Sequence, residues 1–304
     1  MKCKWACLRL RDAFYRGHIL AVAEYTDLKY LGFEKYEHFE YVLLQVRGGA
    51  QLHVLEANPR YCVQVFVAED DMRSVRHHIK ATFKTPALGH VCVLHNKPAM
   101  YAFLDEWYAL PDFEVPQLKC DALVWGFPHV IVFDLDSTLI TEQEQVQIRD
   151  PHVYDCLEEL RDAGCVLVLW SYGSREHVAH ALREVQLVPY FDAVISEGST
   201  AELAPATKTN AQADVRYVRS HFRLDLRARE GDELPKSPKV VIKILADKRV
   251  NYFKSITLVD DLPSNNFAYD YYVRVKRCPV PVRDWQRYHE EILENLAEHD
   301  ILYS

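Results

Sequence analysis

The sequence has no cysteine pair at CxxC spacing, no long apolar run and no excess of basic residues. Its 8 cysteines are scattered, which favours free thiols in a reducing compartment, the cytosol or the nucleus. No apolar run approaches the roughly 20 residues that span a bilayer, so we expect no membrane partner. Charges interrupt the first residues, Met1 to Phe14, so they do not predict a signal peptide.

Basic residues are outnumbered, because 36 Lys and Arg face 44 Asp and Glu and give a formal net charge of -8. A protein that tracks nucleic acid with its whole surface is usually basic, so direct bulk nucleic-acid binding is not expected. A mildly acidic chain instead suits basic partners. The sequence also lacks internal repeats and low-complexity tracts. Its 304 residues are enough for one large domain or two ordinary ones.

A proline-containing break at 110–118 separates two parts of the chain. We place the boundary near residue 124, which gives an N-terminal α/β region at 1–124, of unassigned function, and a second domain at 125–304. In the first part, apolar runs predict strands at 63–67 and 90–95, and a helix is expected at 70–83.

The second part alternates strands and helices, which predicts an α/β fold with a parallel sheet and helices on both faces. A polar insertion interrupts the alternation at about 198–236. Asp284 is expected to cap a final amphipathic helix. The strands are predicted at 130–133, 166–170, 191–196, 256–259 and 272–275, and the other helices begin at about 150, 174 and 237.

Acidic side chains follow two of these strands. Asp134 and Asp136 come directly after the strand at 130–133, within the string Asp-Leu-Asp-Ser-Thr, and Asp260 and Asp261 end the strand at 256–259. Because active sites of open parallel sheets form at the carboxyl ends of strands, these carboxylates are expected to meet there. Adjacent carboxylates are stable together when a hard cation lies between them.

Two further elements complete the pattern. Ser171, Tyr172 and Gly173 lie between a strand and a helix, where a hydroxyl and free backbone N–H groups form an anion site. Lys239 lies just inside a helix start, where a nearby phosphate and carboxylates would offset its unfavourable position in the helix dipole. Lys236 and Lys243 are rivals for this place. His177 and His180 have no partners at zinc spacing and are interpreted as ordinary residues.

Each element by itself also fits an ordinary turn or helix cap, but their order along successive strand–helix units is specific. This order resembles the haloacid-dehalogenase-like phosphohydrolase superfamily, over about residues 129–266. The resemblance implies a Rossmann-like fold, Asp134 as a nucleophile that forms an aspartyl-phosphate, and Asp136 as general acid and base. Ser171 and Lys239 would stabilise the phosphoryl group.

The same resemblance implies a Mg²⁺ cofactor. Its ligands would be Asp134, the Asp136 backbone carbonyl and Asp261, with Asp260 in direct or indirect support. Thr138, Tyr172 and Gly173 would contact the substrate, although Tyr172 fits packing on the sheet edge equally well. Only one helix fits between the first two motifs, so the large cap typical of small-molecule members is not expected there. Capless members act on large substrates.

The string Val-Ile-Val-Phe-Asp-Leu-Asp-Ser-Thr-Leu-Ile-Thr and the segment around Asp260 are similar to a baculovirus branch of this superfamily that acts in nucleocapsid assembly. The resemblance implies viral capsid proteins as partners and the host nucleus and virion nucleocapsid as the setting. The implied substrate is a phosphorylated, basic, protamine-like protein that condenses viral DNA. Two alternatives remain: a structural assembly factor that uses the fold for contacts, and a nucleic-acid-end phosphatase.

Overall fold

The computed structural model describes most of the chain, and its described residues form two compact units. Unit 1 consists of Met1–Phe127, Leu245–Lys254 and Asp300–Ser304, and unit 2 of Pro128–Ile244 and Ser255–His299. The predicted boundary near residue 124 falls outside the described residues. The described ranges are 2–31, 39–46, 53, 56–57, 59–97, 101–121, 126–143, 145–196, 217–218 and 236–303.

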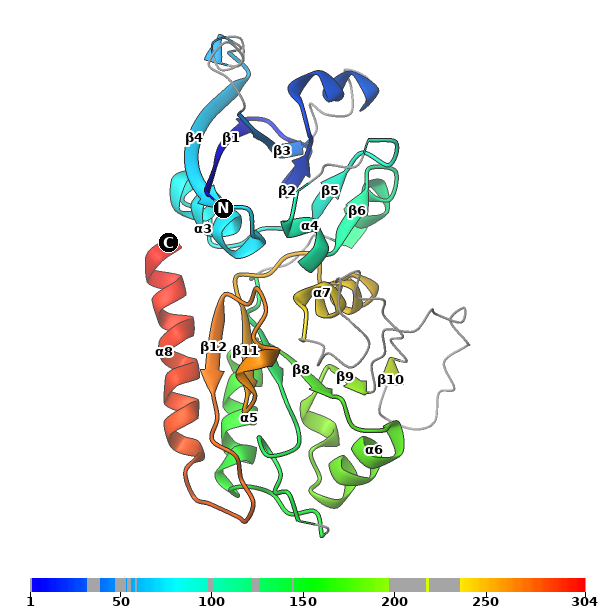
Figure 1. Ribbon diagram of the computed structural model, residues 1–304, viewed down its shortest axis with the longest axis vertical. Helices are drawn as coiled ribbons and strands as arrows, with labels where there is room; N and C mark the ends of the chain where they lie inside the picture. The colour runs from blue at the N-terminus through cyan, green and yellow to red at the C-terminus, as the bar shows by residue number, and fades with distance from the viewer. Residues whose placement is uncertain are drawn as a thin grey trace. The chain divides into compact units, whose positions relative to one another are not determined.

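The described part of unit 1 contains a six-stranded mixed sheet with the order β4-β1-β3-β2-β5-β6 (Figure 1). β1 pairs antiparallel with β3 and β4, whereas β2, β3, β5 and β6 pair in parallel. The elements are β1 (Lys2–Leu10), β2 (Tyr15–Ala21), η1 (Tyr25–Leu31), β3 (Phe39–Gln45), β4 (Tyr61–Glu69), α3 (Met72–Phe83), β5 (Val91–Val93), α4 (Phe103–Glu106), β6 (Ala109–Pro111) and η2 (Val115–Asp121). The α/β character expected for the N-terminal region is therefore present.

Unit 2 contains an entirely parallel sheet, with the order β10-β9-β8-β7-β11-β12 among its described residues. The strand β7 is buried along its whole length, as expected for a parallel strand covered on both faces. The elements are β7 (Val130–Phe133), α5 (His152–Asp162), β8 (Val166–Ser171), α6 (Arg175–Glu184), η3 (Val188–Tyr190), β9 (Ala193–Ser196), β10 (Tyr217–Val218), α7 (Pro238–Asp247), β11 (Ile256–Asp260), η4 (Pro263–Asn265), β12 (Tyr271–Arg274) and α8 (Trp285–Tyr303).

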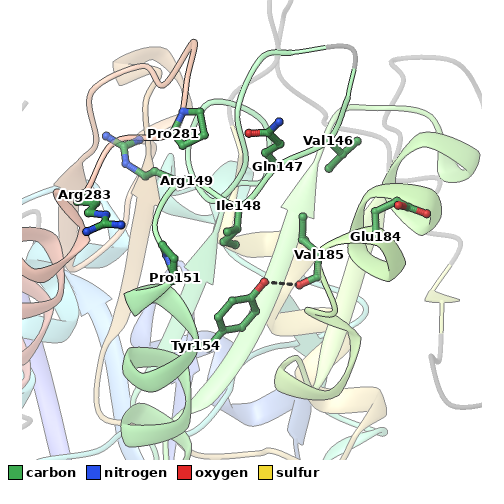
Figure 2. Close-up of a pocket in the computed structure, with 10 residues that line it drawn as sticks. All are labelled: Val146, Gln147, Ile148, Arg149, Pro151, Tyr154, Glu184, Val185, Pro281 and Arg283. Carbon is green, nitrogen blue, oxygen red and sulfur yellow. Dashed lines mark hydrogen bonds between the residues drawn. The ribbon is translucent and has the colours of Figure 1, made fainter.

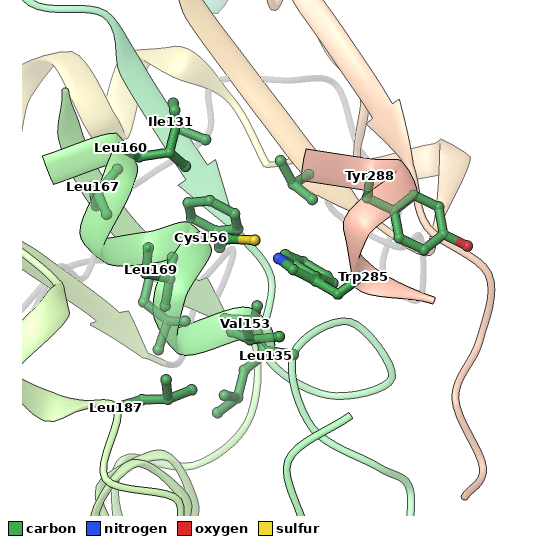
Figure 3. Packing of buried hydrophobic residues seen from close by; sticks show 14 of the residues in the cluster. Ile131, Leu135, Val153, Cys156, Leu160, Leu167, Leu169, Leu187, Trp285 and Tyr288 are labelled. Atoms are coloured by element: carbon green, nitrogen blue, oxygen red, sulfur yellow. The ribbon is translucent and has the colours of Figure 1, made fainter. Parts of the chain in front are cut away.

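One face of this sheet is covered by α5, α6 and α8, which share a single apolar cluster with the strands. Figure 3 shows Cys156 of α5 pointing toward Trp285 of α8, with Ile131 of β7 nearby. The chain passes from β7 through β8 to β9 in one direction and then returns to β11 on the other side of β7. Because parallel crossovers are right-handed, this reversal places α7 on the face opposite α5 and α6.

The reversal also makes β7 and β11 neighbours at the topological switch point of the sheet, where an α/β fold forms its crevice. The expected Rossmann-like architecture with helices on both faces is therefore confirmed. Most of the insertion predicted at about 198–236, and with it any covering of the site, lies outside the described residues.

The predicted cap of α8 is wrong. Asp150 accepts a hydrogen bond from the backbone N of Trp285 at 3.0 Å and another from His152 at 3.0 Å, so one buried carboxylate caps both α8 and α5. Asp284 instead receives two hydrogen bonds from the buried guanidinium of Arg149, at 2.8 and 2.9 Å. A bidentate partner satisfies both carboxylate oxygens better than one amide, which explains the exchange.

Seven cysteines in the described residues are free thiols, in line with the expectation from their spacing. None of the described helices is both long and apolar enough to cross a membrane.

Candidate active site

The acidic motifs meet at the carboxyl ends of β7 and β11. Asp134 follows β7 directly, and its backbone N donates to the carbonyl of Val259 at 2.9 Å, which continues the pairing of the two strands. Asp260 is the last residue of β11 and is completely buried. The ladder between the strands therefore fixes the separation of the two carboxylates.

Lys236 joins these carboxylates. Its Nζ donates to Asp134 Oδ1 at 2.5 Å and to Asp260 Oδ2 at 2.7 Å. The lysine side chain is 1% exposed, so the three charges interact away from water, where ion pairs are strong. The two carboxylates raise the pKa of Lys236 even though burial opposes this, and the ammonium stays charged.

The lysine position differs from the sequence prediction, which favoured Lys239. Lys239 is half-buried, and its backbone N donates to the hydroxyl of Ser237 at 3.2 Å. Lys243 is exposed one turn further along α7. Lys236 lies two residues before the start of α7 and reaches both carboxylates from there. The three lysines lie within eight residues, so only the packing of α7 distinguishes them.

Three carboxylates could hold a cation. Asp134, Asp260 and Asp261 are all buried, and one oxygen of each lies within 4.8 Å of the others. Oxygen ligands of this kind suit a hard divalent cation such as Mg²⁺. Asp260 already accepts from Lys236, from the backbone N of Leu262 at 2.8 Å and from the side chain of Asn265 at 2.9 and 3.0 Å. Asp134 and Asp261 are therefore better placed for direct contact with a cation than Asp260.

Burial raises the pKa values of two carboxyl groups in this cluster. Burial, partly offset by Lys236, raises the pKa of Asp134 to about 6. Burial and the neighbouring charge of Asp260 raise the pKa of Asp261 as well. A cation between the carboxylates would favour their charged forms, so the residues present fit a divalent cation.

The Asp136 side chain contacts two residues from the next strand–helix unit. Its Oδ2 accepts from the hydroxyl of Ser171 at 3.1 Å, and its Oδ1 lies 2.7 Å from Nε2 of His177. The Asp136 side chain is 44% exposed, so a substrate can reach it. The sequence analysis interpreted His177 as an ordinary residue. Its contact with Asp136 joins residues 41 positions apart, and no local pattern in the sequence indicates it.

The turn after β8 is compact. Ser171 accepts from the backbone N of Gly173 at 3.0 Å, and a Cβ on Gly173 would come within 2.9 Å of the His177 ring. Glycine therefore lets α6 start close to Asp136. Tyr172 is 36% exposed, and its ring centre lies 5.9 Å from the Lys236 Nζ. The ring lies beside Lys236 and is partly exposed, so the predicted contact of Tyr172 with a substrate stays a prediction.

Thr138 is completely buried, so it cannot touch a substrate directly as the sequence suggested. Its hydroxyl is buried near Asp134 and slightly opposes the rise that burial causes in the pKa of that carboxyl. Ser137 adopts a left-handed backbone with φ of 61°, which turns the loop back after Asp136. Arg149 holds this turn, because it donates to the carbonyls of Ser137 at 3.1 Å and Thr138 at 3.4 Å.

A pocket of about 470 Å³ lies beside this loop and contains none of the predicted site residues. Figure 2 shows Arg149 and Pro281 on one side and Glu184 and Val185 on the other. The Tyr154 hydroxyl donates to the Val185 carbonyl at 2.7 Å across its floor. The described groups in the pocket carry no pair of acid and nucleophile, so the candidate site remains at the strand ends.

The structure thus brings together Asp134, Asp260, Asp261 and Lys236 in one cluster, and Asp136, Ser171 and His177 in a second. A buried, lysine-bound carboxylate beside a cation site can attack an electrophile. An exposed carboxylate next to it can move protons. Together they supply a nucleophile and a proton donor, which displacement at phosphorus can use.

Comparisons with known proteins give relatives from insect viruses. The chain is 74% identical to an "Uncharacterized 36.0 kDa protein" of Orgyia pseudotsugata multicapsid polyhedrosis virus, over 100% of this chain and 98% of the relative. It is 58% identical to an "Uncharacterized 38.0 kDa protein in P143-LEF5 intergenic region" of Autographa californica nuclear polyhedrosis virus, over 99% and 97%. A protein of Cryptophlebia leucotreta granulosis virus is 35% identical, over 99% of this chain and 86% of the relative.

Among solved structures, a putative beta-phosphoglucomutase from Thermotoga maritima matches with a TM-score of 0.29 and 14% identity, over 56% of this chain and 99% of that one. This likeness is too remote to indicate a shared activity. A family model matches residues 3–303, which is nearly the whole chain. The chain belongs to the family described as "Protein of unknown function (DUF705)", with relatives in baculoviruses.

Proposed function

We propose that unit 2 is a Mg²⁺-dependent phosphatase of the haloacid-dehalogenase-like superfamily with Asp134 as its nucleophile. The observation that carries the proposal is the cluster in which buried Lys236 binds Asp134 and Asp260, with Asp261 alongside. A buried carboxylate held in one position by an ammonium group is prepared for attack. A structural ion pair would not require a third carboxylate and an exposed acid beside it.

In the first step, an Asp134 oxygen forms a bond to phosphorus while the bond to the leaving oxygen breaks and Asp136 gives that oxygen a proton. In the second step, Asp136 takes a proton from water, which attacks phosphorus and releases phosphate and the free Asp134 carboxylate. Lys236 and Ser171 stabilise negative charge on the phosphoryl oxygens. Mg²⁺, held by Asp134 and Asp261 with Asp260 behind them, would neutralise part of that charge.

The substrate that we propose is a phosphorylated, basic, DNA-condensing protein that is dephosphorylated during viral nucleocapsid assembly. The baculovirus relatives and the formal net charge of -8 support this proposal. Capsid proteins would be the partners, in the host nucleus and the virion. The sequence likeness to the nucleocapsid-assembly branch motivates both assignments.

The test is phosphate release from an aryl phosphate and from an arginine-rich phosphoserine peptide, with Mg²⁺ or with EDTA. We expect release that EDTA abolishes and that falls about 10³-fold or more in Asp134→Asn. Asp155→Asn removes the same charge from an exposed position on α5 and serves as the control. Absence of release from both substrates would contradict the proposal and favour the structural assembly factor. Full rescue of capsid assembly by Asp134→Asn would do the same.

A further inference from the structure

A groove of about 710 Å³ adjoins the candidate cation site. It begins at Asp261 and runs between the end of β12 and the start of α8. Four basic residues line it: Arg274, Lys276, Arg277 and Arg287. All four are exposed, and we call this set the basic groove. Its acidic lining is limited to Asp261 and Glu291, so the groove has an excess of positive charge on a chain that is acidic as a whole.

The backbone under the basic groove is fixed by buried contacts. Tyr288 is buried, and its hydroxyl accepts from the backbone N of Lys276 at 3.2 Å. Arg149 donates to the Lys276 carbonyl at 2.8 Å and lies over the Tyr288 ring at 5.2 Å. Arg274 is the register partner of Asp260, so the sheet itself sets its place beside the cation cluster. The backbone that carries Arg274 and Lys276 is therefore fixed relative to the site.

The charges in the groove are only partly neutralised. Arg277 lies 2.9 Å from Glu142 and 3.5 Å from Asp261. Within the described ranges, no carboxylate forms an ion pair with Arg274, Lys276 or Arg287. Clustered like charges oppose folding unless a counterion neutralises them, and clefts lined by one sign of charge attract ligands of the other sign. The groove thus suits a multiply charged anion.

We propose that the basic groove binds a second phosphate group of a phosphoprotein substrate while the phosphoserine being cleaved lies at Asp134. This inference rests on the proposed function and names the substrate class of the same site. Asp261 lines the groove and also lies within 4.8 Å of Asp134 through its ligand oxygen, so the two subsites are contiguous. An extended peptide covers about 3.3 Å per residue, so two phosphoserines two residues apart would be separated by roughly 7 Å along the chain.

The basic groove carries the opposite charge to the chain as a whole, so it would select different parts of a basic substrate. Arginines of a basic substrate would be repelled by Arg274 and Arg287, whereas closely spaced phosphates would be attracted. The enzyme would accordingly select densely phosphorylated stretches of a basic protein and release them once they carry one phosphate. Free arginine-rich product would not be retained at the groove.

The experiment compares two synthetic peptides of equal length, with one phosphoserine or with two phosphoserines two residues apart, and an aryl phosphate. We expect wild type to have a KM at least five-fold lower for the doubly phosphorylated peptide. In the double variant Lys276→Gln and Arg287→Gln, this preference should fall to less than two-fold. The advantage should also decline as salt is raised, because exposed charges are screened.

Arg161→Gln is the matched control, since Arg161 is exposed on α5 outside the groove. If wild type has an equal KM for the two peptides and cleaves the aryl phosphate normally, the proposal that the groove binds a second phosphate is wrong. The proposed phosphatase activity would still stand. If wild type cleaves neither the aryl phosphate nor the peptides, the proposed function itself is wrong. A stronger preference for a 3′-phosphorylated oligonucleotide, lost in the double variant, would overturn the phosphoprotein assignment.

Discussion

At the residue scale, one lysine decides how the proposed nucleophile, Asp134, is held. Lys236 separates two buried carboxylates that would otherwise repel each other, Asp134 and Asp260. Lys236→Met should lower phosphatase activity about 100-fold or more, because one donor to the phosphoryl group and the support of the nucleophile are lost together. It should also lower the melting temperature, since breaking a buried ion pair costs about 3–5 kcal/mol. Activity assays and thermal unfolding would measure both effects.

The comparison variant is Lys239→Met, at the position that the sequence favoured. Lys239 makes no described side-chain contact with the carboxylates, so its replacement should change activity less than two-fold. A larger loss in Lys239→Met than in Lys236→Met would contradict the geometry and restore the sequence prediction.

His177 is a positioning residue at the same scale. Its ring contacts Asp136 from α6 and so orients the carboxylate that would transfer protons. His177→Gln should lower kcat about ten-fold and leave KM and the melting temperature nearly unchanged, because the histidine is partly exposed and contacts the proposed acid, Asp136. His180→Gln, three residues further along the same helix, is the control. A parallel fall in stability would show a structural role instead.

At the element scale, Arg149 connects three segments. It binds Asp284 before α8, the carbonyls of Ser137 and Thr138 in the loop after β7, and the carbonyl of Lys276 after β12. Lysine cannot reproduce this planar set of donors. Arg149→Lys should therefore reduce the free energy of unfolding by about 3 kcal/mol and lower kcat through the loosened loop.

Urea-induced unfolding and steady-state kinetics would test this expectation, with exposed Arg161→Lys as the control. Unchanged stability together with unchanged kcat would show that the loop keeps its shape without the guanidinium.

At the scale of the whole molecule, unit 1 is closed by a segment far away in the sequence. His18 Nδ1 accepts from the backbone N of His90 at 2.9 Å, and its Nε2 meets the hydroxyl of Tyr252 at 3.1 Å. His90 lies 3.3 Å from the side chain of Asn251. A Cβ on Gly89 would come within 2.4 Å of the His18 ring, so glycine is required for this close packing.

These buried histidines make the fold sensitive to acid. Burial lowers the pKa of His18 to about 3 and of His90 to about 4, and nearby Arg76 lowers the latter further. The unfolded chain, with a pKa near 6.5, therefore binds more protons than the folded chain between about pH 6.5 and 4. Stability should be complete above pH 6.5 and fall as the pH decreases, by about 1.4 kcal/mol per pH unit for each histidine.

Urea-induced unfolding at pH 7.5 and pH 5 would measure this loss. His18→Gln removes one titrating group, so it should lower stability at pH 7.5 but reduce the additional loss at pH 5. The same pH dependence in the variant and in wild type would contradict the assignment.

The sequence by itself determined the parts of this protein that depend on local order. Apolar runs predicted β7 and β11, and their order with the aspartates predicted which strand ends meet, because parallel strands align their carboxyl edges. Helix starts at Ser174 and Pro238 follow from local preferences for capping and for the first turn.

Only the tertiary structure decided which side chains meet across elements. It placed Lys236 instead of Lys239 on Asp134, and it gave the first amide of α8 to Asp150 and the guanidinium of Arg149 to Asp284. It also placed His177 on Asp136 and gathered the basic groove from β12 and α8. These contacts depend on the packing angle and depth of each helix. Those are set by the shape of the whole core, to which any single stretch of sequence contributes only a part.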